Sequence, residues 1–352
     1  MNENRRQKWG LHICIFISVM ALTFWSVFRN QDFMEMTGSI QRLSIQSMAM
    51  AVLLAVFFVA GEGCIIWYLL KGIGERAGLF RCISYSFIGF FFSGITPSAT
   101  GGQPMQLYYM KKDGNKISSA SVVLMAVAVI YKFVLALTGI GIMLFWGVPL
   151  RGYLKGYYWM YFLGLFLNIA VVTVLLLVMF SPGIIRKIFY RTEKMLIGVK
   201  VWKESDLRKD KMDQFLSEYQ ETVGFLRRHK KMIVAAIIGT FLQRGSTFLL
   251  TYVVYRGLGL YGTPMLDMIL LQASVYIAVD MLPVPGAQGI TEAMYRAVFK
   301  NVFPADCLVA SLCITRGISF YLVMAVSFTV WGIVHLQKQK DSIAMSRWQK
   351  GK

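Results

Sequence analysis

The sequence predicts an all-α polytopic membrane protein, with six spanning helices and two re-entrant helical hairpins arranged as an inverted repeat. Three observations favour this fold. The 352-residue chain is 56% hydrophobic and only 16% charged, and its mean hydropathy of +0.55 is far above that of an ordinary water-soluble domain. Apolar stretches near the roughly 20 residues needed to cross a hydrocarbon core recur along it. Two shorter apolar stretches end in Pro/Gly-rich breaks, "TPSATGGQP" and "PVPGAQG".

The spanning helices are predicted from the length of the apolar stretches. The first stretch follows Arg5, Arg6 and Lys8 but carries no small-residue cleavage site, so a retained helix is favoured over a cleaved signal peptide. The six predicted spans are 9–28, 47–70, 117–146, 157–181, 232–255 and 307–336.

The two hairpins are predicted from the breaks and from the charged loops beside them. Loops rich in Lys and Arg stay in the cytoplasm. The loops 71–81 and 111–116 are both basic, so the segment between them is expected to enter and leave on the cytoplasmic side. The same rule places segment 265–306 as a hairpin that enters from the outer side, with both chain termini cytoplasmic. The apolar parts that lead into the two breaks are 82–95 and 265–282.

Charges inside the apolar segments indicate the repeat. Glu62 and Lys132 lie 35 positions before and after Pro97, and Arg244 and Arg316 lie 39 before and 33 after the break at 283. Because the two hairpins open in opposite directions, the halves are expected to be inverted copies, as in many transporters. The predicted segments are an N-terminal span with an outer loop (1–46), a first repeat (47–181), a basic amphipathic cytoplasmic linker of one or two helices (182–231), a second repeat (232–336) and a basic cytoplasmic tail (337–352).

The breaks also predict where a ligand binds. An interrupted backbone at membrane depth must be buried in protein or line a wet cavity, and half-helix ends offer free amide groups that suit phosphate. Buried charges within spans are costly and commonly functional. The predicted cavity residues are Glu62, Pro97, Ser98, Thr100, Gly101, Gly102, Gln103, Lys132, Arg244, Asp280, Pro283, Pro285, Gly286, Gly289, Glu292 and Arg316.

Plainer interpretations stay open at this point. Each break is also compatible with a helix kink and a short extramembrane turn. The buried charges could be structural pairs, for example Glu62 with Lys132 and Asp280 with Arg316. Glu292 could cap the helix after the second break or contact an amine.

Several classes of chemistry are not indicated. The sequence has no P-loop, HExxH or GxSxG motif and no CxxC pair, so no catalytic residue, cofactor or metal ion is expected. Most of the net charge of +19 lies in loops; residues 182–231 hold 13 Lys or Arg against 7 Asp or Glu. This pattern favours anionic or aminoacylated phospholipid as partner over direct nucleic-acid binding. A separate synthase and a second copy of the chain are the candidate protein partners.

The stretches "TPSATGGQPMQLYYM" and "LPVPGAQGITEAMY" resemble the paired Pro/Gly signatures of the lysylphosphatidylglycerol synthase transmembrane family, the flippase-like domain of multiple peptide resistance factors. At the first break Pro97, Gly101 and Gly102 match the family pattern, while Gln103 and Gln106 stand where charged residues are common. At the second break the matching residues are Gly286, Gly289 and Glu292, and Ala287 departs from the pattern.

The resemblance implies a protein of the bacterial cytoplasmic membrane that moves aminoacylated phosphatidylglycerol, or another polar lipid, between leaflets and so weakens attraction of cationic antimicrobial peptides. Full-length members add a soluble aminoacyl-transfer domain, which we do not expect here because few residues follow the last predicted span. The alternative is a phosphatidylglycerol lysyltransferase, as enzyme or membrane subunit, whose basic linker docks lysyl-tRNA or a synthase.

Overall fold

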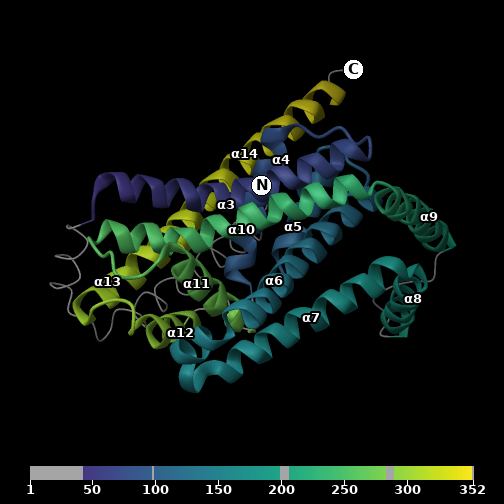
Figure 1. Cartoon of the computed structure of the whole chain (residues 1–352). Helices are drawn as coiled ribbons and strands as arrows, with labels where there is room; N and C mark the ends of the chain where they lie inside the picture. The colour runs from purple at the N-terminus through teal and green to yellow at the C-terminus, as the bar shows by residue number, and fades with distance from the viewer. Residues whose placement is uncertain (1–42, 97–98, 199–205, 283–288, 351–352) are drawn as a thin grey trace.

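The computed structural model describes residues 43–96, 99–198, 206–282 and 289–350, and every regular element within these ranges is a helix (Figure 1). The all-α prediction is therefore confirmed for this part of the chain. Four stretches are long and apolar enough to cross a membrane: Ile45–Gly72, Ile117–Phe180, Lys230–Gly257 and Ala305–Lys340. The predicted span 9–28 lies outside the described residues.

The longest of these stretches holds two of the predicted spans. Helix α6 (Ile117–Leu154) and helix α7 (Tyr158–Phe180) are joined by a short 3₁₀ turn, Lys155–Tyr157, and pack against each other. Helix α6 continues past the predicted end of its span, but its backbone is non-helical at Trp146, three residues before Pro149. Proline removes one helical hydrogen bond and crowds the preceding turn, so it kinks the helix there.

Both predicted breaks separate two helices. Helix α4 (Leu79–Ile95) precedes the first break and α5 (Gly102–Lys112) follows it. Helix α11 (Met265–Val279) precedes the second break and α12 (Ile290–Phe299) follows it. The two helices of each pair pack against each other. The residues at the centres of the breaks, 97–98 and 283–288, lie outside the described ranges.

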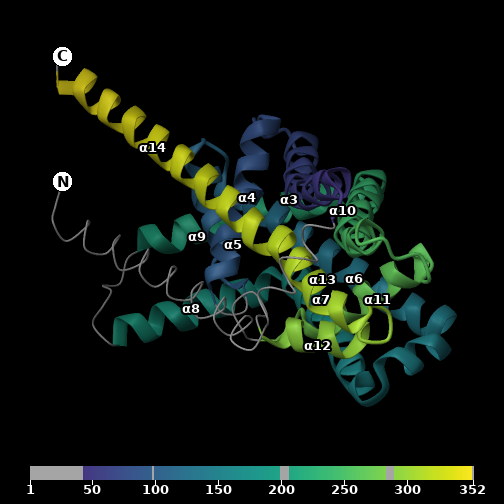
Figure 2. The same cartoon turned by 90° about the vertical axis from the view of Figure 1, so that its left-hand side faces the viewer.

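The last apolar stretch is not one uniform helix. It consists of α13 (Ala305–Arg316), a π-helical segment η4 (Gly317–Leu322) and α14 (Val323–Lys350). A π segment inside a longer helix is uncommon and is often found at functional sites. Figure 2 shows α14 crossing over α4 and extending away from the other helices, and α14 packs on α4.

The linker forms two helices, α8 (Pro182–Gly198) and α9 (Asp206–Arg228). Ion pairs join them, with Arg186 Nη2 3.1 Å from Asp213 Oδ1 and Arg208 Nε 3.1 Å from Glu193 Oε1. Helix α9 also packs on α6, where the buried Tyr219 side chain covers the beginning of that helix. The linker is thus fixed to the helix bundle at one end of α6.

Helices α3 (Ile45–Gly72) and α10 (Lys230–Gly257), one from each predicted repeat, pack closely along their length. Gln243 Nε2 donates to the Phe58 carbonyl at 2.7 Å, and Ser246 Oγ donates to the Leu54 carbonyl at 3.3 Å. The later residue of α10, Ser246, contacts the earlier residue of α3, Leu54, so the two helices are antiparallel.

The two larger of three hydrophobic cores among the described residues lie at opposite ends of the bundle. The core at the linker end includes Leu70, Met110, Met179 and Leu226, and the core at the far end includes Leu43, Leu154, Leu258 and Phe303. Because the start of α4 and the end of α5 pack at the linker end, the first helical hairpin begins and finishes there. The second hairpin begins and finishes at the far end. Helices α3, α6 and α10 run through both cores.

Candidate functional site

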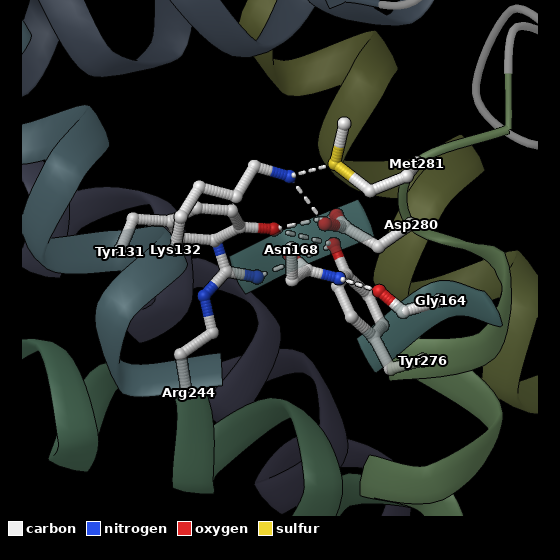
Figure 3. Close-up of polar contacts among 8 residues, drawn as sticks. All are labelled: Tyr131, Lys132, Gly164, Asn168, Arg244, Tyr276, Asp280 and Met281. Carbon is white, nitrogen blue, oxygen red and sulfur yellow. Dashed lines mark hydrogen bonds and ion pairs between the residues drawn. The ribbon is translucent and has the colours of Figure 1, made fainter. Parts of the chain in front are cut away.

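Ionisable side chains meet in the middle of the bundle, between the two cores. We call Tyr131, Lys132, Arg244, Tyr276 and Asp280 the central polar cluster (Figure 3). Lys132 forms an ion pair with Asp280, and Tyr131 donates to Asp280 Oδ1 at 2.8 Å. Arg244 Nη1 donates to the Tyr276 hydroxyl at 3.2 Å. The cluster therefore joins α6, α10 and α11.

Aromatic rings surround the Arg244 guanidinium. Its Cζ lies 3.5 Å from the centroid of the Tyr131 ring, 4.6 Å from that of Phe58 and 5.4 Å from that of Tyr276. Arg244 is only 5% exposed, and within the described ranges it forms no ion pair and its Nε has no hydrogen-bond partner. Ring faces offset part of the cost of burying a cation, but they supply no full negative charge. The guanidinium is therefore held in place while its Nε–H donor stays available for a hydrogen bond.

Glu62 approaches the same region from α3. Its Oε1 accepts a hydrogen bond of 2.7 Å from Gln106 Nε2 of α5, and its carboxylate lies within electrostatic range of Arg244. A Cβ atom on Gly89 would lie 2.7 Å from Gln106 Cδ, so only glycine at position 89 leaves room for the amide. Gln106 thus connects the helix after the first break to the centre of the bundle.

The flanks of the second break are each held by a charge. Asp280, which follows α11, is held by Lys132, whose Nζ also lies 3.0 Å from Met281 Sδ. On the other flank, Arg316 Nε donates to Glu292 Oε1 at 2.8 Å. Glu292 does not cap α12; the N-cap residue is Gly289, whose φ of +78° is unfavourable for other residues.

The ion pairs differ from those considered from the sequence. Lys132 pairs with Asp280 and not with Glu62, and Arg316 pairs with Glu292 and not with Asp280. Each observed pair joins two helices that pack together, α6 with α11 and α12 with α13. Helix α3 also packs on α6, but there Glu62 accepts a hydrogen bond from Gln106 of α5. Both ion pairs have a structural role, because they attach the two flanks of the second break to neighbouring helices.

The first break is closed by neutral contacts. Thr96 Oγ1 donates to the Phe92 carbonyl at 2.7 Å and accepts from the Gly101 amide at 2.9 Å. A Cβ atom on Gly102 would lie 2.7 Å from the Gly89 carbonyl oxygen, so this glycine lets α5 approach α4. Thr100 and Gln103 are exposed, and Gln103 Nε2 donates to the Leu124 carbonyl of α6 at 3.5 Å.

The predicted site residues thus fall into three sets. The central polar cluster includes Lys132, Arg244 and Asp280, with Glu62 beside it. Glu292 and Arg316, with Gly289, lie after the second break, and Thr100, Gly101, Gly102 and Gln103 lie after the first. Pro97, Ser98, Pro283, Pro285 and Gly286 fall outside the described residues.

Several residues of the site were missed by sequence reasoning. Tyr131 precedes Lys132, and Tyr276 lies four positions before Asp280, which on a helix places it on the same face. This spacing was the available signal. Outside the site, Asp113 in a loop interpreted as basic was also missed; it forms an ion pair with Lys338 of α14 and accepts a hydrogen bond from Tyr85 of α4. The described part of the chain contains no group of three or more His, Cys, Asp or Glu side chains placed to hold a metal ion.

These features define a multi-pass helical membrane protein with an ionised centre beside two interrupted helices. The chain belongs to the family described as the lysylphosphatidylglycerol synthase TM region, which matches residues 12–327. The family predicted from the paired Pro/Gly stretches is therefore confirmed. The chain is also 26% identical over 285 residues to the UPF0104 membrane protein PH1989 of Pyrococcus horikoshii, a similarity that covers 79% of this chain and 82% of that relative.

Proposed function

We propose that this protein translocates a phosphate-bearing polar lipid between the leaflets of a bacterial cytoplasmic membrane, with aminoacylated phosphatidylglycerol as the first candidate substrate. The observation that carries the proposal is the buried Arg244 guanidinium between the two cores, held by rings and lacking an ion-paired carboxylate in the described chain. A phosphodiester arriving there would supply the missing charge and acceptor oxygens. The family description, which names lysylphosphatidylglycerol, supports this class of lipid.

The packing supports an inverted repeat as the framework for translocation. Helices α3 and α10 are antiparallel partners, α4 packs on α3, and α11 packs on α10. Across the halves, α6 packs on α11 of the second hairpin while α14 packs on α4 of the first. Each half therefore holds the interrupted helices of the other, an arrangement suited to rocking or gating around a central site.

The charge pairs at the second break suggest how access is controlled. Lys132 with Asp280 and Arg316 with Glu292 fasten its two flanks to α6 and α13. A phosphate competing for Lys132 or Arg316 would loosen one flank at the moment the headgroup enters. The ligand then shifts the equilibrium between closed and open forms because it binds the open form better.

The test is a leaflet-resolved assay in proteoliposomes that contain only this protein, with lysyl-phosphatidylglycerol, phosphatidylglycerol and a glycolipid carrier as separate substrates. We expect Arg244→Gln to lower the translocation rate of the accepted lipid at least about tenfold, since a charged hydrogen bond is worth about 1.5–3 kcal/mol. Arg256→Gln is the matched control, because Arg256 lies on the same helix but is exposed. Equal rates for the two variants would contradict the proposal.

The competing function is a lysyltransferase or its membrane subunit, which the words of the family description also allow. It predicts that no lipid moves in the same vesicles and that adding lysyl-tRNA yields new aminoacyl lipid. If translocation is confirmed, cells lacking the protein should bind cationic antimicrobial peptides more strongly, because less aminoacyl lipid reaches the outer leaflet.

A further inference from the structure

A second group of polar side chains lies beyond the central polar cluster, where α12 meets α13 and η4. The two helices are antiparallel, because Glu292 contacts Arg316 and Tyr295 Oη donates to Ser311 Oγ at 3.2 Å. Arg296 lies one helical turn after Glu292, and Tyr321 lies in the π segment after Arg316. We call Glu292, Arg296, Thr315, Arg316 and Tyr321 the second-break cluster.

Three atoms of this cluster are buried without a hydrogen-bond partner among the described residues. They are Glu292 Oε2, Arg296 Nε and Tyr321 Oη. The residues belong to one neighbourhood: Glu292 and Arg296 both act electrostatically on Cys313, and Glu292 and Arg316 both act on Tyr321. Leaving so many polar atoms unsatisfied in one buried place is costly, and such groups need an explanation.

The unsatisfied atoms specify a ligand. Arg296 and Tyr321 offer donors and need an acceptor, whereas the free oxygen of Glu292 needs a donor. Two arginines against one glutamate leave the cluster with a formal charge of +1. An anion alone would satisfy the donors but would approach the Glu292 carboxylate, which a neutral or cationic donor on the same ligand would offset.

We infer that the second-break cluster binds a phosphodiester headgroup whose far end carries a hydroxyl or ammonium donor, with the phosphate at Arg296 and Tyr321 and the donor at Glu292. The inference deepens the proposed function by adding a subsite and naming the headgroup class. It does not depend on Arg244, because α12, α13 and η4 form the cluster without α10. Occupation of this subsite places the ligand beside the break whose other flank belongs to the central polar cluster.

The test is equilibrium lipid binding to the purified full-length chain in detergent, measured by native mass spectrometry. The two probes are phosphatidylglycerol and phosphatidylmethanol, which share one phosphodiester charge but differ in the terminal hydroxyl groups. The wild-type chain should bind phosphatidylglycerol several-fold more tightly. Arg296→Gln should weaken binding of both lipids about tenfold, as expected for loss of a charged hydrogen bond. Glycerol phosphate without acyl chains shows whether the phosphate ester alone is sufficient.

Further variants separate the ligand contacts from the fold. Tyr321→Phe removes only the hydroxyl and should weaken both lipids several-fold while leaving thermal unfolding unchanged. Glu292→Gln should abolish the preference between the two lipids. Lys300→Gln is the control, because Lys300 is an exposed cation that follows the same helix.

Two results would overturn the inference: equal wild-type affinity for the two lipids, or Arg296→Gln binding as Lys300→Gln does. Because these measurements report binding, their outcome is independent of the vesicle assay. Lipid preference without translocation would retain the subsite and reject the proposed function. Translocation without lipid preference would retain the proposed function and reject the subsite.

Discussion

At the residue scale, the Lys132–Asp280 pair is a buried charge pair whose partners depend on each other. Asp280→Asn should destabilise the protein by about 3–5 kcal/mol, because it leaves the Lys132 ammonium without its counter-charge. The double variant Lys132→Met, Asp280→Leu should recover most of that loss. Unfolding of the single and double variants in detergent measures the coupling, and strictly additive losses would contradict it.

The charged residues could be predicted from the sequence, but their partners could not. A charge in an apolar segment is conspicuous, which is why Glu62, Lys132 and Arg244 stood out. Their contacts depend on how each helix is rotated about its axis and on which helix lies beside it. The short range of an ion pair makes it sensitive to both, so Lys132 was considered with the wrong carboxylate.

At the element scale, Gly164 allows α7 to approach α11. A Cβ atom at this position would lie 2.8 Å from Ala278 Cα and closer still to the Ile277 carbonyl oxygen, and neither is the end of a flexible side chain. Gly164→Ala should therefore separate the two helices and cost about 1–3 kcal/mol in unfolding free energy. The control Gly141→Ala, on α6 with nothing within 4 Å of its Cβ, should be neutral or slightly stabilising. Similar losses for both variants would argue against this close approach.

The docking of α9 on α6 should depend on pH. A hydrogen bond donated by Ser118, aided by Gln214 and the charge of Lys116, lowers the pKa of Glu218 in the folded protein. A carboxyl group with a lowered pKa stabilises the fold above its unfolded pKa of about 4.3, and that stabilisation is lost as the pH falls through the folded value. Amide-exchange protection factors in α9 should therefore fall on acidification. Ser118→Ala should make that fall smaller, and an unchanged pH dependence would contradict the assignment.

Element types followed from the sequence better than element ends. Within the described residues, stretch length and the Pro/Gly breaks predicted the long helices and the helix pairs that flank the two breaks, since these signals are local. Helix α6 instead extends across Trp146 because its far end is buried: Leu150 and Leu154 pack in the core there. The π segment after Arg316 had no sequence signal; in the structure its Phe320 ring packs near Phe90 of α4.

At the scale of the whole molecule, each loop lies beside one of the two cores, either at the linker end or at the far end of the bundle. The turns after α5 and α7 lie at the linker end, and those after α6 and α10 lie at the far end. The basic loops of the sequence give the same grouping of these turns. The remaining step is to assign each end to a membrane face.

Single cysteines introduced into a cysteine-free background make that assignment with an impermeant maleimide. Tyr157→Cys and Tyr261→Cys, both at exposed far-end positions, should react in intact cells. Lys112→Cys and Arg228→Cys, exposed at the linker end, should react only after the membrane is opened, because basic loops remain cytoplasmic. Labelling of Lys112→Cys from outside, with Arg228→Cys protected, would mean that segment 79–112 crosses the membrane. The two helices α4 and α5 would then make one interrupted crossing that ends on the opposite membrane face, and an inverted repeat of two re-entrant hairpins would be wrong.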